Sequence, residues 1–193
     1  LCEYLDDCII KHIDGGSTAI VVLGQYFNTI TNEVISYHNI PHDYSIITSP
    51  HIKMNLLGIN IGDSQSFLFP IKRIIENDQN FSKFELTIPQ HPDNQNEKER
   101  IKASGSFIKD SYINVPYKNY ENEEKGEIYE IGVARAFGDK DFKSNPNIHK
   151  SKQAVTYIPE FVYSSMYPGD ILLLSCDGVD ISPTKLANIV ESR

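Results

Sequence analysis

Two segments of the sequence place an aspartate at the end of an apolar run, next to a glycine. The first, residues 56–63, ends on Asp63, and the second, residues 171–178, contains Asp177, with Asp180 close behind. A carboxylate at the end of a buried strand loses solvation unless a cation, backbone N–H groups or water compensate it. Oxygen ligands suit Mg²⁺ or Mn²⁺, and paired ions activate water and neutralise phosphoryl oxygens. These segments could form a divalent-metal site, but Asp beside Gly is ordinary turn chemistry, and the local pattern alone favours the turn.

Other polar side chains offer less chemistry. Arg135 follows an apolar run, so its planar guanidinium is suited either to holding an anion or to pairing with Asp139 or Asp141 at the surface. His38 and His42 are four residues apart, but a proline lies between them and interrupts a helical ligand pair. We interpret both histidines as solvated loop residues.

Several enzyme classes lack their usual signals in this chain. The sequence contains no G-x-S-x-G, no phosphate-binding P-loop and no G-x-G-x-x-G motif. Serine hydrolase, kinase and dinucleotide-binding interpretations are therefore disfavoured.

Length and composition indicate one globular domain. The chain has 193 residues, 40% of them hydrophobic and 23% charged, which matches ordinary globular proteins. The net charge is −8 without any basic block, which argues against nucleic acid and anionic membranes as partners. Its apolar runs are far shorter than the roughly 20 residues that span a bilayer. We expect a soluble protein.

The cysteines indicate a reducing compartment. There are three, at positions 2, 8 and 176, and no CxxC spacing occurs. This pattern predicts neither a disulfide framework nor a thiolate zinc site. An intracellular location, cytoplasmic or nuclear, fits best. Because the sequence begins at Leu1 rather than methionine, we also expect a removed upstream segment.

The pattern of apolar and turn-forming residues predicts many strands and few helices. Asn94 with Glu97 three residues later has the form of a capping box, and Gly105 stops the helix between them. Gly62 to Gln65 form the turn of a hairpin. The expected helices are residues 1–13, 95–104 and 186–190; the expected strands are 17–23, 54–61, 66–68, 81–88, 128–133, one or two within 154–166, and 171–176; residues 109–127 form an exposed loop or flap. These elements favour a sandwich or layered α+β domain.

Five motifs occur in an order that resembles the metal-dependent protein serine/threonine phosphatases of the type 2C class. One such motif is a weak signal, whereas five in the family order are specific. The motifs are Gly16-Ser17-Thr18-Ala19; Asn60-Ile61-Gly62-Asp63-Ser64; Pro92-Asp93-Asn94 with Glu97-Lys98-Glu99-Arg100-Ile101; Ala134-Arg135-Ala136-Phe137-Gly138-Asp139; and Cys176-Asp177-Gly178.

The resemblance implies a fold and a reaction. It implies an α+β fold with a central antiparallel β-sandwich flanked by helices in α/β/β/α layers, here one domain over residues 1–193, truncated at both ends. It implies two Mn²⁺ or Mg²⁺ ions and a third, weaker one. A bridging water would attack the phosphorus of phosphoserine or phosphothreonine in a phosphoprotein substrate, without a phosphoenzyme. Residues 109–127 fall where the family carries its variable flap.

The resemblance also assigns metal ligands. Asp177 corresponds to a ligand of the two-metal site, and Asp63 would help a third ion together with Asp177 and Asp180. The family's D-G-H-G-G motif is absent from residues 1–15, its final D-N motif lies beyond the end of this chain, and Asp180 follows Asp177 by three positions where the family usually has four. The ligand set within the chain is therefore incomplete.

Two other functions remain open at this point. A pseudophosphatase would keep the fold as a binding or regulatory module without metals. A metal-dependent hydrolase acting on another phosphate ester is the third interpretation.

Overall fold

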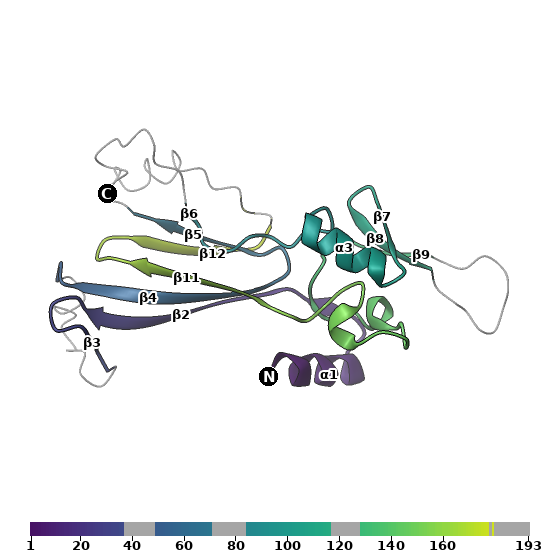
Figure 1. Ribbon diagram of the computed structural model, residues 1–193, viewed down its shortest axis with the longest axis horizontal. Coiled ribbons are helices and arrows are strands. Elements are labelled where there is room, and N and C mark those ends of the chain that lie inside the picture. The colour runs from purple at the N-terminus through teal and green to yellow at the C-terminus, as the bar shows by residue number, and fades with distance from the viewer. Residues whose placement is uncertain (37–48, 71–83, 117–127, 178, 180–193) are drawn as a thin grey trace. The chain divides into compact units, whose positions relative to one another are not determined.

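The structure is a computed structural model that describes residues 1–36, 49–70, 84–116, 128–177 and 179 (Figure 1). The chain divides into two compact units, and each is built from segments that are far apart in the sequence. Unit one comprises Leu1–Ala19, Asn60–Ser64 and Pro89–Pro159; unit two comprises Ile20–Ile59, Gln65–Ile88 and the chain from Glu160 onward.

Unit one combines two helices with short antiparallel strands. Strands β1 and β10 pair with each other, and β7, β8 and β9 form a second sheet in that order. Its core contains Ile101, Ile113 and Val155, all fully buried. The elements are α1 (Cys2–His12), β1 (Gly16–Ser17), α3 (Gln95–Ala103), β7 (Phe107–Lys109), β8 (Tyr112–Pro116), β9 (Ile128–Ile131), β10 (Phe137–Gly138) and two 3-10 turns, η3 (Lys140–Lys143) and η4 (Lys150–Lys152).

Unit two contains two sheets, which Figure 1 labels strand by strand. One has the order β11-β4-β2-β3 and the other β12-β5-β6. Phe67 and Phe69 of β5 pack against Ile171 and Leu173 of β12. The strands are β2 (Ala19–Asn28), β3 (Glu33–Val34), β4 (Ile52–Ile61), β5 (Gln65–Phe69), β6 (Phe84–Glu85), β11 (Glu160–Met166) and β12 (Ile171–Ser175); the ends of β2 and β4 extend into unit one.

The predicted hairpin at Gly62 is wrong. Strands β4 and β5 form where expected, but β4 pairs with β11 and β2, whereas β5 pairs with β12 and β6. The turn therefore carries the chain from one sheet to the other. A glycine turn between two apolar runs cannot distinguish these cases, because pairing partners far along the chain decide which strands become neighbours.

The first helix is confirmed, and its buried side is not apolar. Leu1 and Ile13 are exposed, and the buried residue of α1 is Asp6. The strand expected at residues 17–23 also forms, as β1 and the start of β2, but Val21 and Leu23 are exposed rather than buried. Asp6 takes the inner position because it forms an ion pair with Lys143.

The helix after Asn94 is confirmed, but the capping box is not. Within the described residues, the Asn94 side chain makes no capping hydrogen bond, and its Nδ2 donates instead to the Pro89 carbonyl at 2.7 Å. Glu97 bonds to two arginines instead of the helix start. Gly105, with φ of +88°, follows the end of the helix as predicted.

The predicted flap is partly sheet. Residues 109–116 belong to the β7–β8 hairpin, in which Ile113 and Asn114 are buried. The rest of that loop, residues 117–127, and the predicted helix at 186–190 lie outside the described residues. Among the helices of the described part of the chain, none is long and apolar enough to cross a membrane.

Candidate functional site

Asp63 lies in a tight turn between β4 and β5. The preceding Gly62 has φ of +109°, a conformation that side chains with a Cβ rarely adopt. A Cβ added there would lie 2.3 Å from Thr18 Cγ2, so the Thr18 side chain leaves no room for one. The Thr18 and Ser64 hydroxyl oxygens are 3.2 Å apart and hydrogen-bonded. The backbone around Asp63 is therefore fixed on both sides.

Two buried amide side chains hold this turn from inside. The Gly62 N–H donates to Gln90 Oε1 at 2.7 Å, and the Gln90 N–H donates to the Gly62 carbonyl at 2.9 Å. Asn60 Nδ2 donates to the same carbonyl at 3.1 Å. Gln90 was missed in the sequence because it lies in a proline-flanked loop that carries no signal for such a role.

Asp177 follows β12 and is exposed. The Val179 N–H donates to the Cys176 carbonyl at 3.4 Å, which closes a turn around it. Asp63 belongs to unit one and Asp177 to unit two. Asp180, like His38 and His42, lies outside the described residues. A site shared by Asp63, Asp177 and Asp180 stays a prediction.

The donor chemistry of the aspartates fits a hard divalent cation in part. Carboxylate oxygens are the ligands that Mg²⁺ and Mn²⁺ prefer. Within the described residues, however, no three His, Cys, Asp or Glu side chains are grouped so that they could hold a metal ion.

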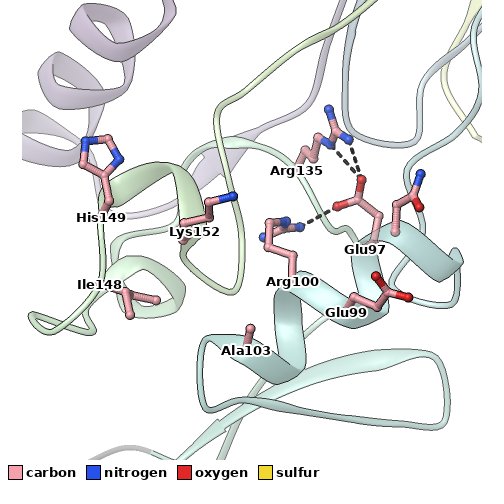
Figure 2. A pocket seen from close by; sticks show the side chains of 9 residues that line it. Glu97, Glu99, Arg100, Ala103, Arg135, Ile148, His149 and Lys152 are labelled. Atoms are coloured by element: carbon pink, nitrogen blue, oxygen red, sulfur yellow. Dashed lines mark hydrogen bonds and ion pairs between the residues drawn. The ribbon is translucent and has the colours of Figure 1, made fainter.

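Glu97 is the centre of a buried ion-pair cluster in unit one (Figure 2). Its side chain is 5% exposed; Oε2 is 2.6 Å from Arg100 Nη2, and Oε1 is 2.6 Å from Arg135 Nη2. Burial alone would raise the pKa of Glu97, but the hydrogen bonds and charges of Arg135 and Arg100 outweigh burial and lower it. The carboxylate therefore remains ionised at neutral pH.

The cluster also ties three backbone segments together. Arg100 donates to the carbonyls of Ala134 and Ala154, each at 2.7 Å, and Arg135 Nη1 donates to the Ile158 carbonyl at 3.0 Å. Arg135 thus pairs with Glu97, and not with Asp139 or Asp141 as one alternative had it. These contacts give Arg135 a structural role.

An open pocket of about 600 Å³ adjoins this cluster. Figure 2 shows the two arginine side chains converging on Glu97 at its edge, with Lys152 and His149 on the facing loop. The other lining residues are Asn96, Glu99, Ala103 and Ile148. Positive and negative side chains are mixed around it.

A second buried ion pair attaches α1 to the segment after β10. Lys143 Nζ is 2.6 Å from Asp6 Oδ1, and the same oxygen accepts the Gly138 N–H at 2.8 Å. Burial raises the pKa of the nearby Asp139; the Lys143 charge opposes this rise, and the Asp6 and Asp141 carboxylates add to it. The Arg135 to Asp139 motif is thus held by α1 on one side and by Glu97 on the other.

A family model and curated relatives match this chain. The model described as Protein phosphatase 2C matches residues 45–188. A probable protein phosphatase 2C 2 of Paramecium tetraurelia is 28% identical over 158 residues, which are 81% of this chain and 43% of the relative. Protein phosphatase 2C homolog 2 of Schizosaccharomyces pombe is 32% identical over 95 residues, 49% of this chain and 22% of the relative. The chain spans less than half the length of these curated relatives.

Solved structures agree on the fold. A phosphatase from a pathogenic strain of Toxoplasma gondii has a TM-score of 0.61 and 24% identity, covering 98% of this chain and 62% of that one. A Caenorhabditis elegans sex determining protein has a TM-score of 0.51 and 20% identity, covering 99% and 36%. The predicted α+β fold class with antiparallel sheets is therefore confirmed. With five motifs in order and a family model matched over residues 45–188, this chain belongs to the protein phosphatase 2C family.

Proposed function

We propose that this chain, as a single phosphatase-like domain over residues 1–193, is the part of a metal-dependent protein serine/threonine phosphatase that carries Asp63 and Asp177. The substrates are phosphoproteins bearing phosphoserine or phosphothreonine. Membership in the protein phosphatase 2C family supports the reaction class. The three cysteines are free in the part of the chain described, which contains them all, and this supports a location in the cytoplasm or nucleus.

The main support for this proposal is that buried side chains fix the backbone of the Asp63 turn by hydrogen bonds. A loop aspartate that served only to form a turn would not need a buried glutamine and a buried asparagine to fix its backbone. Gln90 and Asn60 are 2% and 0% exposed, and both bond to Gly62, the residue before Asp63. Fixed geometry of this kind suits a metal ligand, because a side chain whose backbone is already ordered loses less conformational freedom when the ion binds.

Three aspartates would hold Mn²⁺ or Mg²⁺ in the whole protein. Asp177 would be a ligand of a two-metal site, and Asp63 and Asp180 would help Asp177 with a third ion. Such ions, when bound, lower the pKa of a bound water and neutralise the oxygens of a phosphoryl group. Asp63 supplies an oxygen ligand from a rigid turn, and Asp177 supplies one from the end of β12.

The test is an aspartate substitution in the full-length protein. Asp177→Ala is expected to abolish Mn²⁺-dependent phosphate release from a phosphothreonine peptide while the far-ultraviolet circular dichroism spectrum is unchanged. Glu33→Ala is the matched control, because Glu33 is an exposed acidic residue of the same unit and is expected to retain activity. Retained activity in Asp177→Ala would remove Asp177 from the metal site.

The same assay separates the other functions. Release from small phosphate esters but not from phosphopeptides would indicate a different phosphate-ester hydrolase. Absence of both activities, with no effect of Mn²⁺ on the melting temperature, would favour a pseudophosphatase, because a ligand that binds only the native state raises its stability.

A further inference from the structure

Gln90 lies in unit one at the point where two motifs distant in sequence meet. Its side chain joins it to Asn60 and Gly62: the Gly62 N–H donates to Oε1 at 2.7 Å, and Nε2 donates to the Asn60 carbonyl at 3.3 Å. Its backbone N–H donates to the Gly62 carbonyl at 2.9 Å. Main chain and side chain of Gln90 together therefore clamp the backbone just before Asp63.

The remaining backbone group of Gln90 extends the clamp to a second motif. The Ala134 N–H donates to the Gln90 carbonyl at 3.0 Å. Arg135 follows Ala134, and its carbonyl oxygen would lie 3.0 Å from a Cβ placed on Gly62. The Asn60–Ser64 turn and the segment at Ala134 and Arg135 are therefore in close contact. Gln90 therefore links the Asn60–Ser64 turn to the segment that Glu97 holds through Arg135.

Because the hydrogen bonds of Gln90 to Gly62 and Asn60 are buried, they favour one backbone conformation of the turn. Gln90 is 2% exposed, so the amide cannot exchange its partners for bulk water. If the turn moved away, the Gly62 N–H and the Gln90 amide would lose a buried hydrogen bond, and an unmet buried donor or acceptor is costly. Other conformations of the turn are therefore strongly disfavoured.

We propose that Gln90 is a positioning residue for Asp63: its buried amide fixes the Asn60–Ser64 turn so that the Asp63 carboxylate is held ready for a divalent cation. This inference rests on the proposed function, which makes Asp63 a metal ligand. Gln90 itself does not contact the ion. It acts through the Gly62 backbone, in the way that partners of metal ligands generally orient them.

Gln153 provides a matched control within the same unit. It is also a buried glutamine, 3% exposed, and its side chain clamps another loop. Gln153 Oε1 accepts the Asn145 N–H at 3.1 Å, and Nε2 donates to the carbonyls of Asn145 and Ile148 at 2.8 Å and 3.2 Å. Replacing either glutamine by leucine removes side-chain hydrogen bonds to backbone groups, two at Gln90 and three at Gln153, but only Gln90 holds the Asp63 turn.

The experiment compares Gln90→Leu, Gln153→Leu and Asp63→Asn in the full-length protein. The first readout is the Mn²⁺ concentration that gives half of the maximal rise in melting temperature. Gln90→Leu and Asp63→Asn are expected to increase this Mn²⁺ concentration by about tenfold. Gln153→Leu is expected to lower the melting temperature without changing the Mn²⁺ concentration at the midpoint. The second readout is amide hydrogen exchange at Gly62, which is expected to accelerate in Gln90→Leu alone among the glutamine variants.

The outcomes separate this inference from the proposed function. A Mn²⁺ midpoint that shifts in Asp63→Asn but not in Gln90→Leu overturns the positioning role and leaves the metal site intact. A wild-type protein without any Mn²⁺ response contradicts the proposed function, and Gly62 exchange then still decides whether Gln90 holds the turn. If Gln90→Leu does not fold, Gln90→Glu replaces it. Its carboxylate still accepts the Gly62 N–H, so exchange at Gly62 should stay slow, and fast exchange would contradict the clamp.

Discussion

Lys143 and Asp6 form a nearly fully buried ion pair, with side chains that are 5% and 2% exposed, and Lys143 follows Asp6 by 137 positions in the sequence. Lys143 Nζ also donates to the Ala136 carbonyl at 2.8 Å, and Asp6 accepts the Gly138 N–H. The pair therefore attaches α1 to the segment that contains Arg135 and Asp139. Each charge of the pair is the ion-pair partner of the other, at 2.6 Å.

Lys143→Met is expected to destabilise the protein strongly. The substitution leaves Asp6 as a buried carboxylate whose counter-charge is gone, which typically costs about 3–5 kcal/mol in the free energy of unfolding. Lys140→Met is the control, because the pair between Lys140 and Asp14 is exposed and its loss should change stability little. Urea denaturation measures both. Equal effects of the two substitutions would mean that burial of the Asp6 pair does not matter.

Asp139→Asn is expected to stabilise the protein at neutral pH. Because burial raises the pKa of Asp139 in the folded state, the folded protein binds its proton more tightly than the unfolded chain does. Stability from this group is thus present below its ordinary pKa of 3.8 and is lost as the pH rises through the folded value. Asparagine stays neutral and tolerates the positive φ of 51° at this position.

The measurement for Asp139 is the difference in unfolding free energy between variant and wild type as a function of pH. The difference should be small in acid and should grow in favour of Asp139→Asn as the pH rises. A difference that is constant across this range would show that ionisation of Asp139 is not its cause.

Gly62→Ala is expected to destabilise the Asp63 turn for two reasons. A positive φ costs a residue with a Cβ of order 1–3 kcal/mol, and the new methyl would clash with Thr18 Cγ2 at 2.3 Å. Adding Thr18→Ser removes that methyl group while keeping the hydroxyl that bonds to Ser64. The double variant should therefore regain part, but not all, of the lost melting temperature, because the positive φ remains and Thr18 Cβ, which serine keeps, would still lie 2.5 Å from the new methyl. A full recovery would show that the backbone conformation costs nothing.

Elements whose signal lies in a short stretch of sequence were predictable. The apolar spacing of residues 1–13 predicted α1, and Gly105 marked the end of α3 because glycine readily adopts the positive φ found there, +88°. The aspartates were found in the same way, since Asp63 and Asp177 each follow an apolar strand. The resemblance of the motifs to the family implied which ions these carboxylates would hold, Mn²⁺ or Mg²⁺.

Features that depend on distant partners were not predictable. Glu97 has the correct spacing for a capping box with Asn94, but Arg135, 38 positions away, bonds to it instead. Asp6 lies on the buried side of α1 because Lys143, 137 positions away, pairs with it. Gln90 has no sequence pattern at all. In each case the deciding contact is a buried hydrogen bond or charge pair, which local spacing does not encode.

The most direct test of the account is phosphate release from a phosphothreonine peptide, measured with Mn²⁺ and then with EDTA, for this chain and for a form extended to the natural termini. The account predicts that the extended form releases phosphate with Mn²⁺ and that EDTA abolishes the activity, because the D-G-H-G-G motif of the family does not occur within residues 1–193. No release from the extended form with Mn²⁺, or release that persists in EDTA, would contradict a metal-dependent phosphatase.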